Sequence, residues 1–142
     1  MEELLIPADV QGRTRLLILQ GSPFCNIDCE YCYLAGRDDR RRMQHDLVER
    51  AVNWVYRNGL AGDDLTIVWH AGEPLVLSPQ WYSEAFARAG RAARDGARIL
   101  QAMQTNGMLI DDAWCDRNSR CCHFWRGRRA AGRQSHDGCR QI

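Results

Sequence analysis

The chain has 142 residues, of which 45% are hydrophobic and 26% are charged, so it has room for one domain with a core of modest size. The first residues lack the cationic start and apolar run of a signal peptide, and no later stretch reaches the roughly 18 apolar residues that cross a bilayer. The formal net charge is +1, and we expect a cytoplasmic protein with neither a membrane nor a nucleic acid as partner.

An apolar run and an amphipathic run open the regular structure. Thr14 to Gln20 is a short apolar run that ends at a Gly-Ser-Pro turn, which predicts a buried parallel strand. Asp46 to Asn58 has apolar residues at helical spacing before Gly59, with Asp46 as the expected N-cap and Glu49 three residues on. We therefore expect a strand, a cysteine-bearing loop and then a helix.

Two further pairs of strand and helix follow along the chain. Leu65 to His70 predicts a second strand, and a Ser-Pro pair at Ser78 predicts the start of the next helix. Arg98 to Gln104 predicts a third strand, and a last helix is expected to open at Asp111 or Asp112. Strands that alternate with helices form a parallel sheet, and in barrels of this kind the chemistry lies where strands end.

The seven cysteines are an odd number in a chain without an export signal, which favours metal binding over a disulfide framework. Three of them, Cys25, Cys29 and Cys32, lie in the loop after the first expected strand. They read C-x3-C-x2-C, with Tyr31 just before the third cysteine. Three thiolates on one short loop can hold three irons of a cubane cluster, and the fourth iron then stays open to a substrate or cofactor.

A zinc site or a ferredoxin-type cluster is the plainer alternative for this triplet. Zinc prefers four closed ligands, usually in paired C-x2-C units, and the two-cluster ferredoxin run is C-x2-C-x2-C-x3-C. Neither pattern matches the spacing of Cys25, Cys29 and Cys32. The spacing therefore favours a cluster with one open iron.

With Tyr31 in place, the motif resembles the signature of radical S-adenosylmethionine (SAM) enzymes. The resemblance implies a [4Fe-4S] cluster on the three cysteines, with the amino and carboxylate groups of SAM bound at the open iron. One electron from the cluster would cleave the C–S bond and release a 5′-deoxyadenosyl radical, and the backbone beside Tyr31 would face the adenine. It also implies an α/β fold, the N-terminal arc of a partial (β/α)6 barrel, truncated after about three βα units.

A second motif of the resemblance follows the second expected strand. His70-Ala71-Gly72-Glu73-Pro74 matches the family's GGEP element, with Ala71 in the place of the first glycine. Carbonyls and a carboxylate on a turn suit the ammonium of a methionine moiety, so the resemblance assigns this loop, Ala71, Gly72, Glu73 and Pro74, to SAM binding. Taken alone, the tetrapeptide is as often a plain βα turn, and His70 is more often a hydrogen-bonding residue than a ligand or acid-base group.

The third motif, Gln104-Thr105-Asn106-Gly107, closes the third expected strand and looks like the QTNG segment of the peptide-modifying branch. There, polar side chains reach the ribose or carboxylate of SAM, which makes Thr105 and Asn106 candidate cofactor-binding residues. The alternative is an ordinary turn, because Asn-Gly is a common turn pair. The sequence assigns no catalytic side chain of its own.

The stretch from Leu17 to Leu34, continued by Arg37 to Met43, resembles the start of radical SAM/SPASM peptide maturases. It is closest to the cyclophane-forming branch and is similar also to the anaerobic sulfatase maturases. The resemblance implies an oxidoreductase that modifies a ribosomally made precursor peptide or a protein, with an electron donor such as flavodoxin or ferredoxin. A non-catalytic iron-sulfur or metal-binding module, a truncated pseudogene product, is the alternative; it predicts metal without SAM cleavage.

The resemblance stops near Trp114, where the composition changes. Residues 1–114 carry 12 Arg against 16 Asp and Glu, whereas residues 115–142 carry 7 Arg against 2 Asp. The second part has neither strand nor helix periodicity, and GC-rich DNA read out of frame gives such an Arg- and Cys-rich mixture. We expect a partial radical SAM core over 1–114 and an irregular tail over 115–142, out of frame or disordered. The alternatives are a basic nucleic-acid tail or a metal tail on Cys121, Cys122, His123 and Cys139.

Overall fold

The computed structural model describes residues 14–118, 122–124 and 139–141. Within this part of the chain, four strands form one sheet in the order β1-β3-β4-β5, and every neighbouring pair runs parallel. A separate antiparallel pair joins β2 to β6. The bounds are β1 Thr14–Leu19, β2 Ile27–Cys29, β3 Ala61–Trp69, β4 Arg98–Met103, β5 Cys122–Phe124 and β6 Cys139–Gln141.

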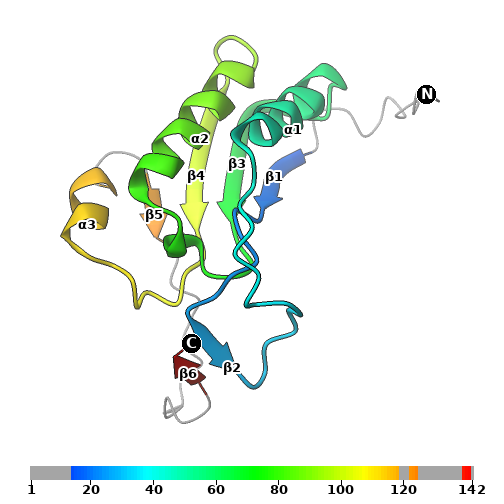
Figure 1. Cartoon of the computed structure of the whole chain (residues 1–142). Helices are drawn as coiled ribbons and strands as arrows, with labels where there is room; N and C mark the ends of the chain where they lie inside the picture. Colours follow the sequence, from blue (N-terminus) through cyan, green and yellow to red (C-terminus); the bar gives the residue numbers. More distant parts are fainter. Residues whose placement is uncertain (1–13, 119–121, 125–138, 142) are drawn as a thin grey trace, which may run out of the picture.

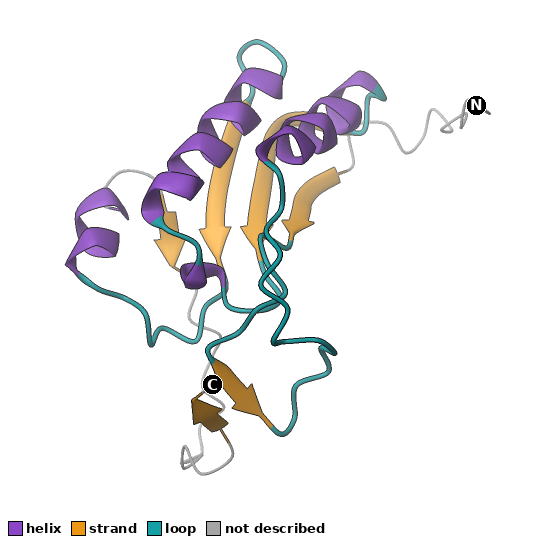
Figure 2. Cartoon of the chain, in the orientation of Figure 1, coloured by secondary structure: helices purple, strands orange, loops and turns teal. Residues whose placement is uncertain are grey.

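The helices connect the parallel strands as right-handed crossovers require. Helices α1 (His45–Arg57) and α2 (Pro79–Ala92) lie side by side on one face of the sheet (Figures 1 and 2). A short 3-10 helix, η2 (Pro74–Val76), follows β3, and α3 (Asp112–Asn118) follows β4. The strand and helix order confirms the expected α/β class, and it places the three motif loops at the carboxyl ends of β1, β3 and β4.

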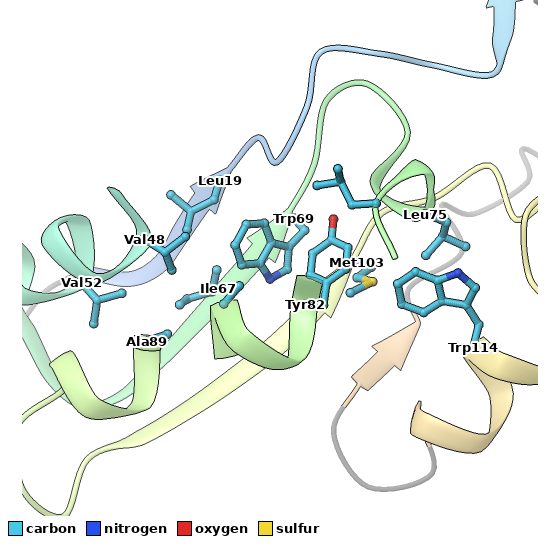
Figure 3. Close-up of a cluster of buried hydrophobic side chains, with 12 residues drawn as sticks. Leu19, Val48, Val52, Ile67, Trp69, Leu75, Tyr82, Ala89, Met103 and Trp114 are labelled. Atoms are coloured by element: carbon cyan, nitrogen blue, oxygen red, sulfur yellow. The ribbon is translucent and has the colours of Figure 1, made fainter. Parts of the chain in front are cut away.

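The core lies between the sheet and helices α1 and α2, around the fully buried Trp69 at the end of β3 (Figure 3). The Trp69 ring packs edge-on against Tyr82 and Trp81 of α2, with centroids 5.1 and 5.5 Å apart, and each such aromatic pair adds about 0.5–1.5 kcal/mol beyond its buried area. Its indole nitrogen donates to Gln101 Oε1 of β4 at 2.9 Å. These contacts fix the end of β3, from which the His70–Pro74 loop departs.

The opposite face of the sheet carries apolar side chains that remain exposed. Leu16 and Ile18 of β1 are 51% and 57% exposed, and Leu100 of β4 is 39% exposed. Leu16 and Leu100 both pair with Thr66 of β3, so they lie in one row across the sheet. The buried strand predicted over Thr14–Gln20 is therefore buried on one face alone within the described structure, because α1 and α2 both lie on the other.

Most element boundaries agree with the sequence expectations. Strands β1 and β4 each end one residue before the expected end. Helix α2 begins at Pro79 as expected, with the Ser78 hydroxyl accepting from the Trp81 amide at 3.2 Å. Asp111 caps α3 by accepting from the Trp114 amide at 3.0 Å.

Two boundaries differ. Helix α1 begins at His45 with Gln44 in the N-cap position, which makes no side-chain capping bond, and Asp46 lies in the first turn instead of capping it. A carboxylate in the first turn is still favourable, because it faces the positive end of the helix dipole. Strand β3 begins at Ala61, four residues before the expected Leu65, because pairing with β1 and β4 reaches past the apolar run.

Much of the expected tail over residues 115–142 lies outside the described residues, including Cys121 of the metal-tail alternative. Within the described part, β5 extends the sheet beside β4, and β6 pairs with β2. Sequence patterns predicted none of the short strands β2, β5 and β6, since three residues are too few for a periodicity. None of the helices described here is long and apolar enough to cross a membrane.

Candidate functional site

The cysteine loop leaves the carboxyl end of β1 and places three thiols on eight residues. Cys29 is buried, at the end of β2, and Cys25 and Cys32 are half-buried. The Cys32 amide donates to the Cys29 carbonyl at 3.0 Å, which makes a tight turn of the C-x2-C segment. Over the described residues, no three His, Cys, Asp or Glu side chains gather closely enough to hold a metal ion.

The surroundings of Cys25 raise its pKa and so favour the neutral thiol over the thiolate. Burial raises the pKa of Cys25, and the charges of Glu73 and Cys32 act in the same direction, whereas a backbone hydrogen bond at Ile27 and the charge of Arg37 lower it. Because a metal takes the thiolate form, ligation at Cys25 has to release a proton.

The loop after β3 is packed directly against the start of the cysteine loop. Ala71 and Gly72 both have left-handed backbones, with φ of 72° and 66°. A Cβ added at Gly72 would lie 2.4 Å from the Ser22 carbonyl oxygen and 2.8 Å from that of Phe24, so only glycine fits there. The Glu73 amide donates to the Phe24 carbonyl at 2.8 Å. Residues 71–73 therefore hold the chain that immediately precedes Cys25.

The Glu73 side chain points inward and joins two motif loops. It is 1% exposed, and its Oε1 accepts from the Leu75 amide at 2.9 Å and from the Thr105 hydroxyl at 2.5 Å. Its Oε2 accepts from the Asn106 amide at 2.8 Å. We call this set of bonds the carboxylate junction. It satisfies a buried charge with three donors, as burial of a carboxylate requires.

The loop after β4 completes the junction and reaches the cysteine loop. The Asn106 side-chain nitrogen Nδ2 donates to Asn26 Oδ1 at 2.9 Å. Asn26 lies between Cys25 and Cys29 in the sequence, so this bond reaches the cysteine loop itself. The Asn106 Oδ1 accepts from the Met108 amide, and the Thr105 hydroxyl accepts from the Gly107 amide, which closes the turn that Asn-Gly predicted. Thr105 and Asn106 are thus turn residues and also bridges between loops.

Aromatic side chains flank the cysteines on the surface. Tyr31 is 80% exposed and Tyr33 is 78% exposed. The Tyr33 hydroxyl lies 3.4 Å from His70 Nε2, and the His70 amide donates to the Leu19 carbonyl at 3.0 Å. His70 therefore has hydrogen-bonding partners in the end of β1 and in the cysteine loop, as the plainer sequence interpretation expected.

The structure brings the three sequence motifs together at one edge of the sheet. Cys25 follows the residues that Gly72 packs against, and Asn106 bonds the cysteine loop through Asn26. Sequence reasoning missed the Glu73 contacts, although an acidic residue before Pro74 is a helix-start signal. It also missed Arg37, whose side chain donates to the Cys29 carbonyl at 3.0 Å, and no sequence pattern would have found this contact.

Comparison with known proteins identifies relatives over most of the described chain. The family model described as the Radical SAM superfamily matches residues 19–122. An uncharacterized protein of Synechocystis sp. is 36% identical over 109 residues, which are 74% of this chain and 27% of the relative. A serine-type anaerobic sulfatase-maturating enzyme of Klebsiella pneumoniae is 35% identical over 95 residues, 66% of this chain and 24% of that enzyme. The chain spans about a quarter of the length of these curated relatives.

Solved structures give the same result for the fold. A histidine-tagged form of anSMEcpe with bound AdoMet matches with a TM-score of 0.61 and 25% identity, over 72% of this chain and 28% of that chain. Native anSMEcpe with bound AdoMet and Cp18Cys peptide matches with a TM-score of 0.58 and 26% identity, over 71% of this chain and 27% of that chain. The structure of Streptococcus suis SuiB bound to precursor peptide SuiA is similar in fold, with a TM-score of 0.55 and 20% identity. The match covers 78% of this chain and 23% of the SuiB chain.

Proposed function

This chain belongs to the radical SAM superfamily, and from that membership we propose that it carries the cluster- and SAM-binding part of an enzyme that modifies a ribosomally made peptide or protein. The observation that carries the proposal is the placement of the C-x3-C-x2-C loop, with Tyr31, beside the loops after β3 and β4 at the carboxyl edge of a parallel sheet. Chemistry in such sheets lies at this edge.

The donor types present fit an iron-sulfur cluster, and the loop would have to bring its thiols closer together than they lie in this structure to hold it. Three thiols stand on one loop, with none of them in a disulfide, and thiolates are the ligands that such clusters take. When bound, the cluster would supply one electron to the sulfonium of SAM, whose C–S bond breaks to give the 5′-deoxyadenosyl radical. Cys25, Cys29 and Cys32 would hold it.

The loops after β3 and β4 are the proposed seat of SAM. Gly72 lets backbone approach closely, and the carbonyls of Ala71 and Gly72 are acceptors suited to an ammonium group. The Glu73 carboxylate is 1% exposed and bonds the Leu75, Thr105 and Asn106 donors, so it would support this seat from within. Pro74, Thr105 and Asn106 would shape this seat, and the backbone beside Tyr31 would face the adenine.

A peptide or protein substrate is proposed from the relatives. The matched curated enzymes include sulfatase-maturating enzymes, and two matched structures contain both AdoMet and a peptide. An external electron donor of the flavodoxin or ferredoxin class would reduce the cluster. The exposed Tyr31 and Tyr33 lie on the cysteine loop and would be within reach of such partners.

The test is SAM cleavage by the 142-residue chain, fused to a carrier protein and reconstituted anaerobically with iron and sulfide. We expect dithionite to drive formation of 5′-deoxyadenosine from SAM, measured by mass spectrometry, together with a broad thiolate-to-iron absorption. Cys115→Ala serves as the matched control, because Cys115 is exposed and outside the loop. A cluster without SAM cleavage would instead support the non-catalytic iron-sulfur module, and absence of any cluster would refute both.

A further inference from the structure

The segment of residues 36–43, which we call the strap, runs back alongside the cysteine loop on its way to α1. In Figure 1 it crosses the segment that leads from β1 into the cysteine loop. Backbone and side-chain bonds join them along their length. The Ser22 hydroxyl donates to the Arg41 carbonyl at 2.7 Å, and the Met43 amide donates to the Gly21 carbonyl at 2.7 Å. The strap is therefore a structural partner of the cysteine loop and more than a connection.

Arg37 is the strap residue that contacts the cysteines themselves. Its carbonyl accepts from the Cys25 amide at 2.9 Å, and its Nη1 donates to the Cys29 carbonyl at 3.0 Å. The same Cys29 carbonyl accepts from the Cys32 amide. Arg37 thus bonds directly to the backbone of Cys25 and Cys29. Through the shared Cys29 carbonyl oxygen it is also linked to the Cys32 amide.

The planar shape of the Arg37 guanidinium and its charge both contribute to its contacts with the cysteine loop. The second guanidinium nitrogen, Nη2, forms an ion pair with Asp28, while Nη1 bonds the Cys29 carbonyl. The Arg37 side chain is 22% exposed, whereas that of Asp28 is 51% exposed, so the ion pair alone contributes little. A lysine has a single ammonium on a flexible stem, and it cannot hold both partners in this fixed arrangement.

We propose that Arg37 is a positioning residue for the cluster: it fixes the backbone between Cys25 and Cys32 so that the loop retains its iron. The inference rests on the proposed function, because it takes the three cysteines as the cluster ligands. Loss of the Arg37 side chain removes a charge-assisted bond at the centre of the loop and leaves the buried Cys29 with a less restrained backbone. The backbone that carries the thiols then samples more conformations, so the loop should hold its iron less tightly.

The experiment measures iron release to a chelator from the reconstituted fusion of the full chain, without SAM. We expect Arg37→Gln to release iron about tenfold faster than the unmodified chain, as loss of a charge-assisted hydrogen bond predicts. Arg37→Lys should fall between the two. The matched control is Arg42→Gln, which removes an exposed arginine from the same strap, and its release rate should stay within about twofold of the unmodified rate, as for a typical surface substitution.

A second readout separates this inference from the proposed function. In the metal-free chain, hydrogen exchange at the Cys25 and Cys32 amides should be faster in Arg37→Gln than in Arg42→Gln, while exchange in β3 stays the same. Equal iron release and equal exchange in the two variants would overturn the role of Arg37. Faster exchange throughout β3 would overturn it too, because Arg37 would then support the whole fold. Failure of the unmodified chain to bind iron would refute the proposed function, whereas the exchange result would still stand.

Discussion

The cysteine loop and the carboxylate junction lie at the same edge of the sheet, and they are held in opposite ways. The junction is organised from within, by the buried Glu73 carboxylate and three short hydrogen bonds from residues that follow β3 and β4. The cysteine loop has no such buried centre: neighbouring segments hold it, through Arg37 of the strap and the bond from Asn106 to Asn26, and its tyrosines are exposed. A buried charge network rigidifies its surroundings. Under the proposed function, the seat proposed for SAM is preformed, whereas the cysteine loop, whose thiols do not gather closely enough to hold a metal ion, would take its final form with iron.

The largest expected effect is on the loop side. Cys29→Ala removes one of three thiolates, and a cubane with two protein ligands is not retained, so the broad iron absorption should be lost completely. Iron content and visible spectra after anaerobic reconstitution measure this. Full iron content in Cys29→Ala, equal to that of the Cys115→Ala control, would show that the cluster is elsewhere.

The contact between the two regions should be nearly as sensitive. Gly72→Ala forces a Cβ against the Ser22 and Phe24 carbonyl oxygens and adds a side chain at positive φ. Overpacking and the left-handed backbone together predict a loss of about 2–5 kcal/mol in the free energy of unfolding. Urea unfolding followed by tryptophan fluorescence tests it, with Gly90→Ala on α2 as a control, where a Cβ has open space. Equal midpoints for the two variants would contradict the close approach.

The junction itself should affect SAM more than iron. Glu73→Ala leaves the Leu75 and Asn106 amides without their buried acceptor, and a charged hydrogen bond is worth about 1.5–3 kcal/mol, so SAM affinity should fall about tenfold or more while the cluster remains. Thr105→Val removes a single donor, and it should lose less. Titration of SAM against the reconstituted protein distinguishes the variants. Unchanged affinity in Glu73→Ala would remove the junction from the SAM seat.

The smallest effect is expected at Ala71, next to Gly72. Its φ of 72° costs an alanine about 1–2 kcal/mol, whereas a glycine there would lose about 0.5–1 kcal/mol through its freer unfolded chain. Ala71→Gly should therefore raise the free energy of unfolding by up to about 1.5 kcal/mol. The same urea experiment detects it as a higher midpoint. A lower midpoint would mean that the alanine methyl makes a contact worth more than the strain.

The sequence predicted the order of the longer elements, β1, α1, β3, α2, β4 and α3, and the edge where the motifs meet. It did so because the apolar runs of β1, β3 and β4 and the Ser78-Pro79 start of α2 are strong local signals. The start of α1 was misjudged, because Gln44 occupies the N-cap position without a capping bond and Asp46 lies in the first turn. Local capping rules do not include the tertiary contacts that set such a boundary.

For the site, sequence patterns supplied the candidate residues without their partners. Glu73 was expected to face SAM, but its bonds to Thr105 and Asn106 join positions more than 30 apart in the chain, which no short pattern records. Arg37 lies among several arginines of the strap, and its sequence context does not distinguish it from Arg40 or Arg42. Only packing of the strap on the cysteine loop separates them.

The exposed side of the sheet gives the isolated polypeptide the character of an amphiphile. Leu16, Ile18 and Leu100 form an apolar, solvent-exposed surface on one face of the sheet, while helices α1 and α2 cover the other face. Strand β1 also has an unpaired edge in the described sheet. Such a molecule should stack face to face as its concentration rises. Sedimentation velocity at a series of dilutions would reveal this self-association. Low micromolar concentration, or a mild detergent that covers the apolar face, should keep the chain monomeric.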